Sequence, residues 1–427
     1  MITQEEYNLR RLQLLEKMSN NSIAVIFSSD YKTRSNDTEY PYRQNSNFYY
    51  LTGFKEDKSI LVLIKTKYEL KTILFVEKKD EALELWTGKR LGKKEAKKRF
   101  LVSKVFTTDK FEKKFKTYLN NIKNLYFDFK LDSSKELLLK KSAKNIDIYK
   151  NIAPLIGKMR LIKSSSEISI IKKAIDITKD AHHKAISFQK YKKNEYHLQA
   201  ELEYIFKKNG AYSDAYTSII AGGNSANTLH YIDNDKEFID GDLILIDAGC
   251  EFDYYSSDIT RTIPVNGKFT HAQKELYSLV LSVELEIIKM IKPNIKRSKL
   301  QKRSEQLLCK GLVDLGILKG DPKKLYKEKK HKKYYPHGIG HWMGLDVHDE
   351  SPYKDSKGKE ISLKAGMVLT IEPGIYCDKD DETIPHKYRG IGIRIEDDIL
   401  ITEKGHENLS KHIAKTIKEI EFIYAHR

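Results

Sequence analysis

Cysteine is scarce in this chain, with three residues among 427, at positions 250, 309 and 377. Cys250, Cys309 and Cys377 are too few and too scattered for a disulfide framework or for a Cys-x-x-Cys zinc site. We therefore expect all three to be reduced thiols.

Long hydrophobic runs are also missing. The longest aliphatic stretches, ILVLI at 60–64 and LILI at 243–246, have the length of a strand, whereas a membrane helix needs about 20 apolar residues. The N-terminal stretch MITQEEYNLRRLQLLEKM lacks the apolar core of a signal peptide, and its Glu5 and Glu6 are atypical of a mitochondrial transit peptide. We expect a cytoplasmic protein with no membrane partner.

Acidic residues are outnumbered by basic ones, 60 to 77, which gives a formal net charge of +17. Most of the excess is lysine dispersed over the chain, with one dense run, KKLYKEKKHKK, at 323–333. Arginine, the usual reader of bases, is sparse and no recognition motif accompanies the lysines, so we expect no specific nucleic acid partner. The composition favours a lysine-rich solvated surface; a non-catalytic basic module that holds nucleic acid or acidic proteins is the alternative.

The first 160 residues show the pattern of an α/β domain. At 40% hydrophobic and 32% charged residues, the chain is typical of a globular protein and long enough for two domains. Apolar runs bounded by polar turns alternate with helical stretches such as 80–100, which predicts a partly parallel sheet over residues 1–160. The predicted strands are 22–27, 59–65, 72–78 and 124–129.

A domain boundary is predicted near residue 160. Ser164 and Glu167 have the spacing of a capping box, and apolar residues then recur at helical spacing, so a long helix opens the second domain, residues 161–427. Short strands with glycine turns follow, which predicts an α+β domain with mostly antiparallel strands. Further helices are expected at 271–292, 298–315 and 410–420.

The second domain contains two segments with similar sequences. LILIDAGC (243–250) and VLTIEPGIY (368–376) share an apolar strand, an acid, one further residue and a glycine. A second acid follows each of them, Asp258 in YSSDITRT and Glu396 in GIRIEDDILI. This similarity suggests two similar hairpin units, each of which offers two carboxylates to a common site.

Each of the four acids also has an ordinary interpretation. Asp247 and Glu372 can be turn residues at strand ends, Asp258 can begin a strand in solvent, and Glu396 can pair with Arg394. If all four acids had only these ordinary roles, the similarity between the two segments would be unexplained. Clustered carboxylates repel one another unless cations hold them, and oxygen donors with one imidazole favour a hard ion such as Mn²⁺. About four acids suit a pair of metals roughly 3.5–4 Å apart.

Three histidines fall within HGIGHWMGLDVHDE, residues 337–350. His337 and His341 would share one face of a helix, but the glycines at 338, 340 and 344 argue against a helix. We expect a loop that leads into a strand at MGLDV, with the rings aimed separately. A packed or hydrogen-bonded role remains open for His337 and His348.

Together, LIDAG, YSSDITRT, HGIGHWMGLDVHD, TIEPGIY and GIRIEDD resemble the creatinase-like metallopeptidases, over roughly 165 to 405. That family includes methionine aminopeptidase, prolidase and aminopeptidase P, and its catalytic domain has the "pita-bread" fold. YPYRQNSNFYYLTGF (40–54) and LWTGKRLG (85–92) resemble the N-terminal domain of aminopeptidase P. The resemblance implies that residues 1–160 serve oligomerisation and the substrate entrance.

The resemblance implies two divalent metal ions, Mn²⁺ in the first place, with Co²⁺ or Zn²⁺ as alternatives. Asp247 would bind the first metal, Asp258 and Glu396 would bridge both, and His341 and Glu372 would bind the second. Every position of the five-ligand pattern is filled.

The resemblance also implies roles toward the substrate. His230 would lie near the substrate amine and the leaving group, His348 would hydrogen-bond the scissile peptide, and His337 would line the proline pocket. Arg394 would hold the bridging carboxylates, and Tyr376 would line the site.

Trp86 would shape the substrate entrance from a neighbouring subunit, so the resemblance implies a homodimer or homotetramer. The expected activity is that of an Xaa-Pro aminopeptidase acting on peptides with N-terminal Xaa-Pro. A hydroxide held between the metals would attack the carbonyl before proline, with Glu372 as proton shuttle. Prolidase, which cleaves only Xaa-Pro dipeptides, shares all five ligands and is the alternative.

Overall fold

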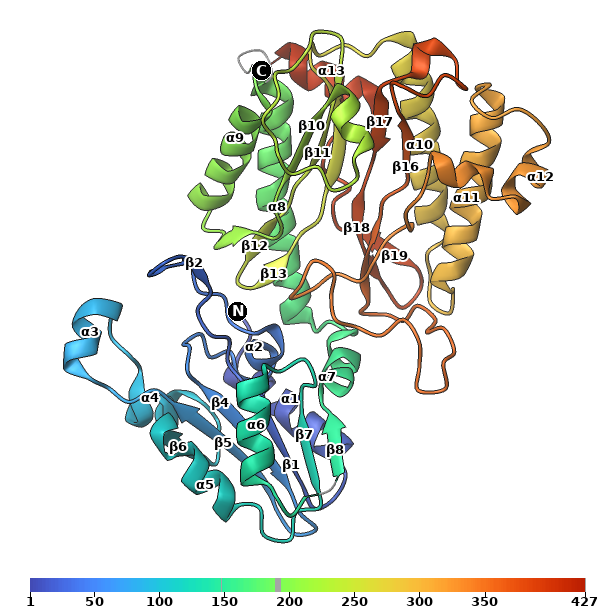
Figure 1. Ribbon diagram of the computed structural model, residues 1–427. Helices are drawn as coiled ribbons and strands as arrows, with labels where there is room; N and C mark the ends of the chain where they lie inside the picture. The colour runs from blue at the N-terminus through green and yellow to red at the C-terminus, as the bar shows by residue number, and fades with distance from the viewer. Residues whose placement is uncertain (147, 189–192, 427) are drawn as a thin grey trace. The chain divides into compact units, whose positions relative to one another are not determined.

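The computed structural model describes residues 1–146, 148–188 and 193–426, which divide into two units, Met1–Arg160 and Leu161–Arg427 (Figure 1). Each unit contains its own cluster of buried apolar side chains. Among the described residues, no helix combines the length and the apolarity needed to span a bilayer.

The first unit is built on a six-stranded sheet with the order β6-β5-β4-β1-β7-β8. Strand β1 pairs in parallel with β7 and antiparallel with β4, and β5 pairs in parallel with β6. This confirms the predicted partly parallel sheet. The strands are β1 (Ser22–Phe27), β4 (Ile60–Lys65), β5 (Leu70–Val76), β6 (Lys104–Thr107), β7 (Asn124–Phe127) and β8 (Ile148–Asn151).

Helices cover both faces of this sheet, which explains why its central strand is apolar throughout. All six residues of β1 are buried. Ile23 and Val25 share a cluster with Phe115 of α5 (Phe111–Thr117), while Ala24 and Ile26 alternate with them and face the opposite side. Strands buried on both faces read as continuous hydrophobic runs. The remaining elements here are α1 (Gln4–Lys17), β2 (Thr33–Ser35), β3 (Thr38–Glu39), α2 (Ser46–Thr52), α6 (Ser133–Ser142) and α7 (Ala153–Arg160).

The helical stretch predicted at 80–100 contains two separate helices, α3 (Glu81–Thr87) and α4 (Gly92–Arg99). Gly88 and Gly92 have φ values of 82° and 67°, in the left-handed region that glycine adopts at little cost. These residues end the first helix and redirect the chain before the second.

The second unit consists of short antiparallel strands flanked by long helices, as predicted. One sheet has the order β10-β11-β14, another β15-β18-β19, and β16 pairs with β17. These strands are β10 (Ile219–Gly222), β11 (Leu243–Asp247), β14 (Thr260–Pro264), β15 (Val368–Ile371), β16 (Gly374–Cys377), β17 (Ile391–Arg394), β18 (Asp397–Ile401) and β19 (His406–Asn408). A smaller sheet joins β9 (Ser213–Asp214), β12 (Cys250–Phe252) and β13 (Tyr255–Ser256).

Two pairs of helices flank these strands from opposite sides (Figure 1). One pair is α8 (Ser165–Phe188) and α9 (Glu195–Lys208), and the other is α10 (His271–Met290) and α11 (Arg297–Asp314). The predicted capping box is present, because the Ser164 N–H donates to Glu167 Oε2 at 2.9 Å and the Glu167 N–H to Ser164 Oγ at 3.2 Å. The short α12 (Pro322–Lys327) follows α11.

The C-terminal helix predicted at 410–420 begins later, as α13 (Ile417–His426). The preceding residues are held in an irregular path by buried charges. Lys415 Nζ lies 2.7 Å from Glu284 Oε1 and also pairs with Asp397, and Arg261 Nε donates to the Ala414 carbonyl at 3.0 Å. These tertiary contacts outweigh the local helical pattern.

The two similar sequence segments belong to two pairs of antiparallel strands, β11–β14 and β15–β18, which carry acids at equivalent ends. Asp247 at the end of β11 is paired with Thr260 at the start of β14, and Ile371 at the end of β15 is paired with Asp397 at the start of β18. Asp258 and Glu396 precede the second strands, so each hairpin presents two acids at one end.

His182 on α8 ties that helix to the end of β11. Its side chain is 1% exposed and its Nε2 lies 3.0 Å from the Ala248 carbonyl oxygen. Burial lowers the pKa of His182 to about 3. The unfolded chain, with an ordinary histidine pKa of about 6.5, therefore binds a proton that the folded chain excludes.

We predict that His182 destabilises the protein in acid. Because its folded pKa is depressed, stability is complete above the unfolded pKa and is lost as the pH falls below it, by about 1.4 kcal/mol between about pH 7.5 and pH 5.5. His182→Gln keeps an N–H donor near the Ala248 carbonyl but cannot titrate. Urea unfolding at both pH values should show this loss in the parent and its absence in the variant; equal pH dependence would contradict the assignment.

Candidate active site

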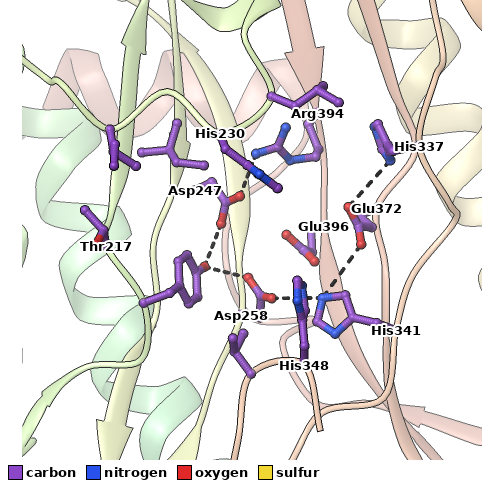
Figure 2. Close-up of a pocket in the computed structure, with 15 residues that line it drawn as sticks. Thr217, His230, Asp247, Asp258, His337, His341, His348, Glu372, Arg394 and Glu396 are labelled. Carbon is purple, nitrogen blue, oxygen red and sulfur yellow. Dashed lines mark hydrogen bonds and ion pairs between the residues drawn. The ribbon is translucent and has the colours of Figure 1, made fainter. Parts of the chain in front are cut away.

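A cavity of about 290 Å³ lies in the second unit and collects residues from both hairpins (Figure 2). All five predicted metal ligands line it. The lining residues are Tyr216, Thr217, Ile219, Leu229, His230, Ile232, Asp247, Asp258, His337, His341, Val347, His348, Glu372, Arg394 and Glu396.

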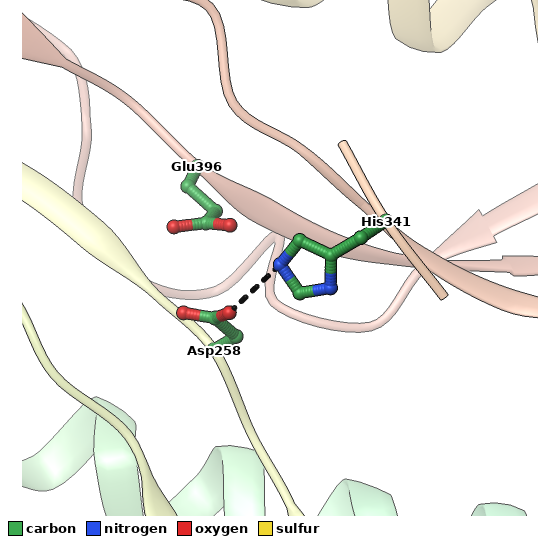
Figure 3. A group of neighbouring side chains, drawn as sticks. All are labelled: Asp258, His341 and Glu396. Atoms are coloured by element: carbon green, nitrogen blue, oxygen red, sulfur yellow. Dashed lines mark ion pairs between the residues drawn. The ribbon is translucent and has the colours of Figure 1, made fainter. Parts of the chain in front are cut away.

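Three of the candidate ligands point at a common position (Figure 3). Asp258, His341 and Glu396 each offer one donor atom, and these atoms all lie within 4.8 Å of one another. Asp258 and Glu396 come from the two different hairpins, and His341 comes from the loop before β15. The centre therefore forms only where the two halves of the unit meet.

His341 is oriented as a metal ligand would be. Its Nδ1 lies 3.1 Å from the Trp342 carbonyl oxygen, which leaves Nε2 facing Asp258 Oδ2 at 3.2 Å and Glu372 Oε1 at 3.8 Å. Burial disfavours its charge, but the hydrogen bond and charge of Asp258 outweigh burial and raise the pKa of His341 to about 9. A proton on this imidazole thus partly balances the acids.

The carboxylates of the cavity are electrostatically crowded. Burial raises the pKa of Glu372 to about 7 despite the opposing charges of His341 and Arg394. Burial and the Asp258 charge raise the pKa of Glu396 well above its usual range, and burial raises that of Asp247. Such a group of acids is stable in ionised form only with added positive charge.

Arg394 supplies part of this charge from β17. Its Nη2 lies 2.5 Å from Asp247 Oδ2, and its Nε donates to Thr260 Oγ1 at 3.2 Å. The Thr260 hydroxyl in turn donates to Glu396 Oε2 at 2.7 Å. Arg394 was expected to hold Asp258 and Glu396; its direct ion pair is with Asp247, and it reaches Glu396 through Thr260.

Tyr216 is a site residue that the sequence did not reveal. Its hydroxyl lies 2.6 Å from Asp247 Oδ1 and 2.5 Å from Asp258 Oδ1, so it joins the two acids of the first hairpin. Burial and these acids raise the pKa of the Tyr216 phenol well above its usual range, which keeps it a donor. The signal in the sequence was a polar aromatic residue just before β10, which has no distinctive spacing.

His337 and Tyr376 form a pair at the other side of the cavity. The Tyr376 hydroxyl lies 2.8 Å from His337 Nε2 and accepts from Arg394 Nη1 at 2.9 Å. His337 Nδ1 lies 2.8 Å from the Gly338 carbonyl oxygen. Burial and the nearby Arg394 lower the pKa of His337 to about 3, so the ring is neutral and its 3.7 Å approach to Glu372 is no salt bridge.

The strand predicted at MGLDV is wrong; residues 343–347 form an irregular loop. The Asp349 N–H donates to the Trp342 carbonyl at 2.9 Å, which folds the segment back on itself. The Asp349 carboxylate lies 3.2 Å from Lys163 Nζ, with both side chains 1% exposed. This loop places the His348 ring against His341, with centroids 4.2 Å apart and planes at 75°.

Gly340 illustrates why this region needs glycine. A Cβ at this position would lie 1.9 Å from the Thr370 carbonyl oxygen. The loop carrying His341 therefore packs directly against β15, where the Thr370 N–H donates to the His341 carbonyl at 3.0 Å. Close backbone approach fixes the imidazole beside Glu372.

Of the two remaining predicted residues, His230 belongs to this cavity (Figure 2) and Trp86 lies in the first unit. His230 lines the cavity, and its side chain is exposed. Trp86 lies on α3 of the first unit, where 85% of its side chain is exposed. Its role at a substrate entrance stays a prediction.

The donor set fits divalent cations. Four carboxylates, of which Asp258 and Glu396 are buried and Asp247 and Glu372 partly buried, with one imidazole match the preference of hard ions for oxygen ligands with an occasional nitrogen. The raised carboxyl pKa values show that positive charge is in short supply within the cavity. We conclude that these residues suit a metal centre of oxygen-rich type.

Two family models match this chain. That of metallopeptidase family M24 matches residues 169–403, and that of the aminopeptidase P N-terminal domain matches residues 7–126. The chain belongs to metallopeptidase family M24. Its α/β first unit and pita-bread second unit confirm the predicted fold class.

Relatives match this M24 peptidase over nearly its whole length. The Xaa-Pro aminopeptidase of Haemophilus influenzae is 40% identical over 420 residues, which cover 98% of this chain and 97% of the relative. Human Xaa-Pro aminopeptidase 3 is 36% identical over 441 residues, covering 99% and 86%. The structure of zinc-substituted Escherichia coli aminopeptidase P in complex with product matches with a TM-score of 0.95 at 38% identity, covering 99% of this chain and 98% of that one.

We predict that Tyr216→Phe weakens metal binding by about tenfold, because residues that orient metal ligands typically contribute 10- to 100-fold in affinity. Titration calorimetry of Mn²⁺ into the metal-free protein measures the change. Tyr204→Phe, at a side chain that is 56% exposed, is the matched control. Equal affinities for all three proteins would rule out a role for Tyr216 in holding the acids.

Proposed function

We propose that this M24 peptidase is an Xaa-Pro aminopeptidase, which releases the N-terminal residue from peptides with proline in second position. The observation that carries the proposal is the 40% identity to an Xaa-Pro aminopeptidase across 98% of the chain, the first unit included. The cavity with its oxygen-rich donor set supports the same conclusion.

The metal centre would be held by Asp247, Asp258, His341, Glu372 and Glu396. Asp258 and Glu396 would hold metal together with His341, because donor atoms of these three residues lie within 4.8 Å of one another. Divalent ions bound there would lower the pKa of a water molecule and polarise the scissile carbonyl. Mn²⁺ is the metal we propose, because carboxylates dominate the donor set.

Glu372 is placed to move the proton of the reaction. A carboxyl group beside the reacting atoms can accept a proton and return it. Its carboxylate also faces His341, so the same group would serve as ligand and as proton shuttle.

Three histidines would act on the substrate. His348 beside His341 would donate to the scissile peptide oxygen as its charge develops, and His230 would assist the departing prolyl nitrogen. His337, kept neutral and oriented by Tyr376, would line the proline pocket. Arg394 would keep Asp247 ionised and aimed at the metals.

The first unit would contribute to assembly. Leu85 and Trp86 are 83% and 85% exposed, as expected for side chains that a second subunit covers. On this proposal the enzyme is a homodimer or homotetramer in which Trp86 shapes the substrate entrance of a neighbour. A cytoplasmic location remains a prediction from the sequence.

The peptide-length dependence of hydrolysis tests the proposal. With Mn²⁺ added, the enzyme should release the first residue from Xaa-Pro-Xaa peptides, and Xaa-Ala-Xaa peptides of equal length should remain intact. Mass spectrometry of the products identifies the bond that is cut. Efficient cleavage of Xaa-Pro dipeptides alone would make the protein a prolidase, and no cleavage of any peptide would overturn the proposal.

We predict that Glu372→Gln lowers kcat by roughly 10²–10⁴-fold, because an amide cannot shuttle a proton. Circular dichroism and the thermal midpoint should show that the fold survives, and metal analysis should report how much metal the variant retains. Glu403→Gln, at an exposed carboxylate of the same unit, is the control. Unchanged turnover in Glu372→Gln would exclude its role.

A further inference from the structure

A buried carboxylate outside the metal centre is bound entirely by groups of one loop. Glu195, the first residue of α9, is 0% exposed. Its Oε1 accepts from the Gly222 N–H at 2.8 Å, and its Oε2 accepts from the Tyr231 hydroxyl at 2.6 Å and from the Lys236 N–H at 3.0 Å. Three donors compensate a charge that burial alone would make costly.

Two of these donors, Gly222 and Lys236, lie at the two ends of the loop that carries His230, which we call its neck, and Tyr231 lies within the loop. Gly222 is the last residue of β10, and Lys236 is the residue where the loop returns to α9. The Glu195 N–H also donates to the Lys236 carbonyl at 2.9 Å. Residues 223–235 thus form a compact loop, and Glu195 contacts the residues at both of its ends.

A second contact fixes the returning strand of this loop. The Asn234 side chain accepts from the Ile220 N–H at 2.9 Å and donates to the Ser218 carbonyl at 2.7 Å. Tyr231, next to His230, is 6% exposed, and burial together with Glu195 raises the pKa of its phenol well above the usual range. The phenol is therefore a stable donor to Glu195, while the neighbouring His230 lines the cavity.

We propose that Glu195 is a positioning residue that sets the place of the His230 imidazole, through Tyr231 and the neck of the loop. This inference rests on the proposed function, in which His230 assists the departing prolyl nitrogen. A displacement of about 1 Å in a reacting group can cost 10²-fold in rate. Weakening the contacts of Glu195 with the neck of the loop should therefore lower mainly kcat.

The chemistry of Glu195→Gln makes the test specific. An amide offers one oxygen acceptor and one NH₂ group, so the NH₂ group would face a donor of the loop in either orientation. The loop neck then loses at least one hydrogen bond and the remaining bonds lose their charge. Tyr231→Phe removes only the hydroxyl contact and keeps the ring.

The experiment is a double-mutant cycle between positions 195 and 230 in the metal-loaded enzyme, with an Xaa-Pro-Xaa peptide as substrate. We expect Glu195→Gln to lower kcat by about 10- to 100-fold, with metal content and KM nearly unchanged. In the His230→Ala background, the same substitution should change kcat by less than about twofold, because the group that it positions is gone. Glu237→Gln, an exposed acid beside the neck, is the matched control.

An equal loss of kcat from Glu195→Gln in both backgrounds would overturn the inference, since Glu195 would then act on the whole site. No effect of Glu195→Gln in the parent would overturn it as well. If Glu195→Gln fails to fold, the same cycle with Tyr231→Phe decides the matter by the same criterion. An inactive parent enzyme would refute the proposed function instead, so the two failures are distinct.

Discussion

The second unit depends on one electrostatic constraint, the confinement of Asp247, Asp258, Glu372 and Glu396 in a cavity of about 290 Å³. Like charges at this spacing oppose folding unless positive charge lies among them. The protein supplies some of it through Arg394 and through the proton on His341, and the single hydroxyl of Tyr216 contacts both Asp247 and Asp258. Divalent cations would add positive charge, so the crowding of acids that opposes folding would also favour metal binding.

The sequence indicated the acids because two similar apolar segments each end in an acid, Asp247 and Glu372, and are each followed by a second acid, Asp258 and Glu396. It could not identify Tyr216, whose hydroxyl contacts Asp247 and Asp258, or Thr260, whose hydroxyl donates to Glu396. A tyrosine before a strand and a threonine within one have no periodic or spacing signal, and their function arises only when β10, β14 and β17 come together. The same limit applies to Arg394, whose direct partner is set by the register of β17 against β16 and by the proximity of β11.

Secondary structure was predictable where hydrophobic periodicity was strong, as in β1, β4 and α8. It failed where tertiary contacts override local pattern. Lys415 is drawn into a buried group with Glu284 and Asp397, so its segment cannot be helical despite its composition. The loop before His348 is likewise bent by the ion pair of Asp349 with Lys163, whose partners are far apart in sequence. Gly88 and Gly92, which have positive φ values, separate the two helices within 80–100, and the sequence alone does not show which glycines adopt positive φ.

The distribution of the acids over two hairpins has a consequence for biosynthesis. Asp247 and Asp258 leave the ribosome long before Glu372 and Glu396, and Lys415, which pairs with the neighbour of Glu396, follows later still. A partly synthesised chain that ends before Glu372 therefore holds only two of the four acids of the cavity. The cavity is therefore complete only after both hairpins have been synthesised, and the order of translation leaves a chain without its second hairpin with an incomplete site.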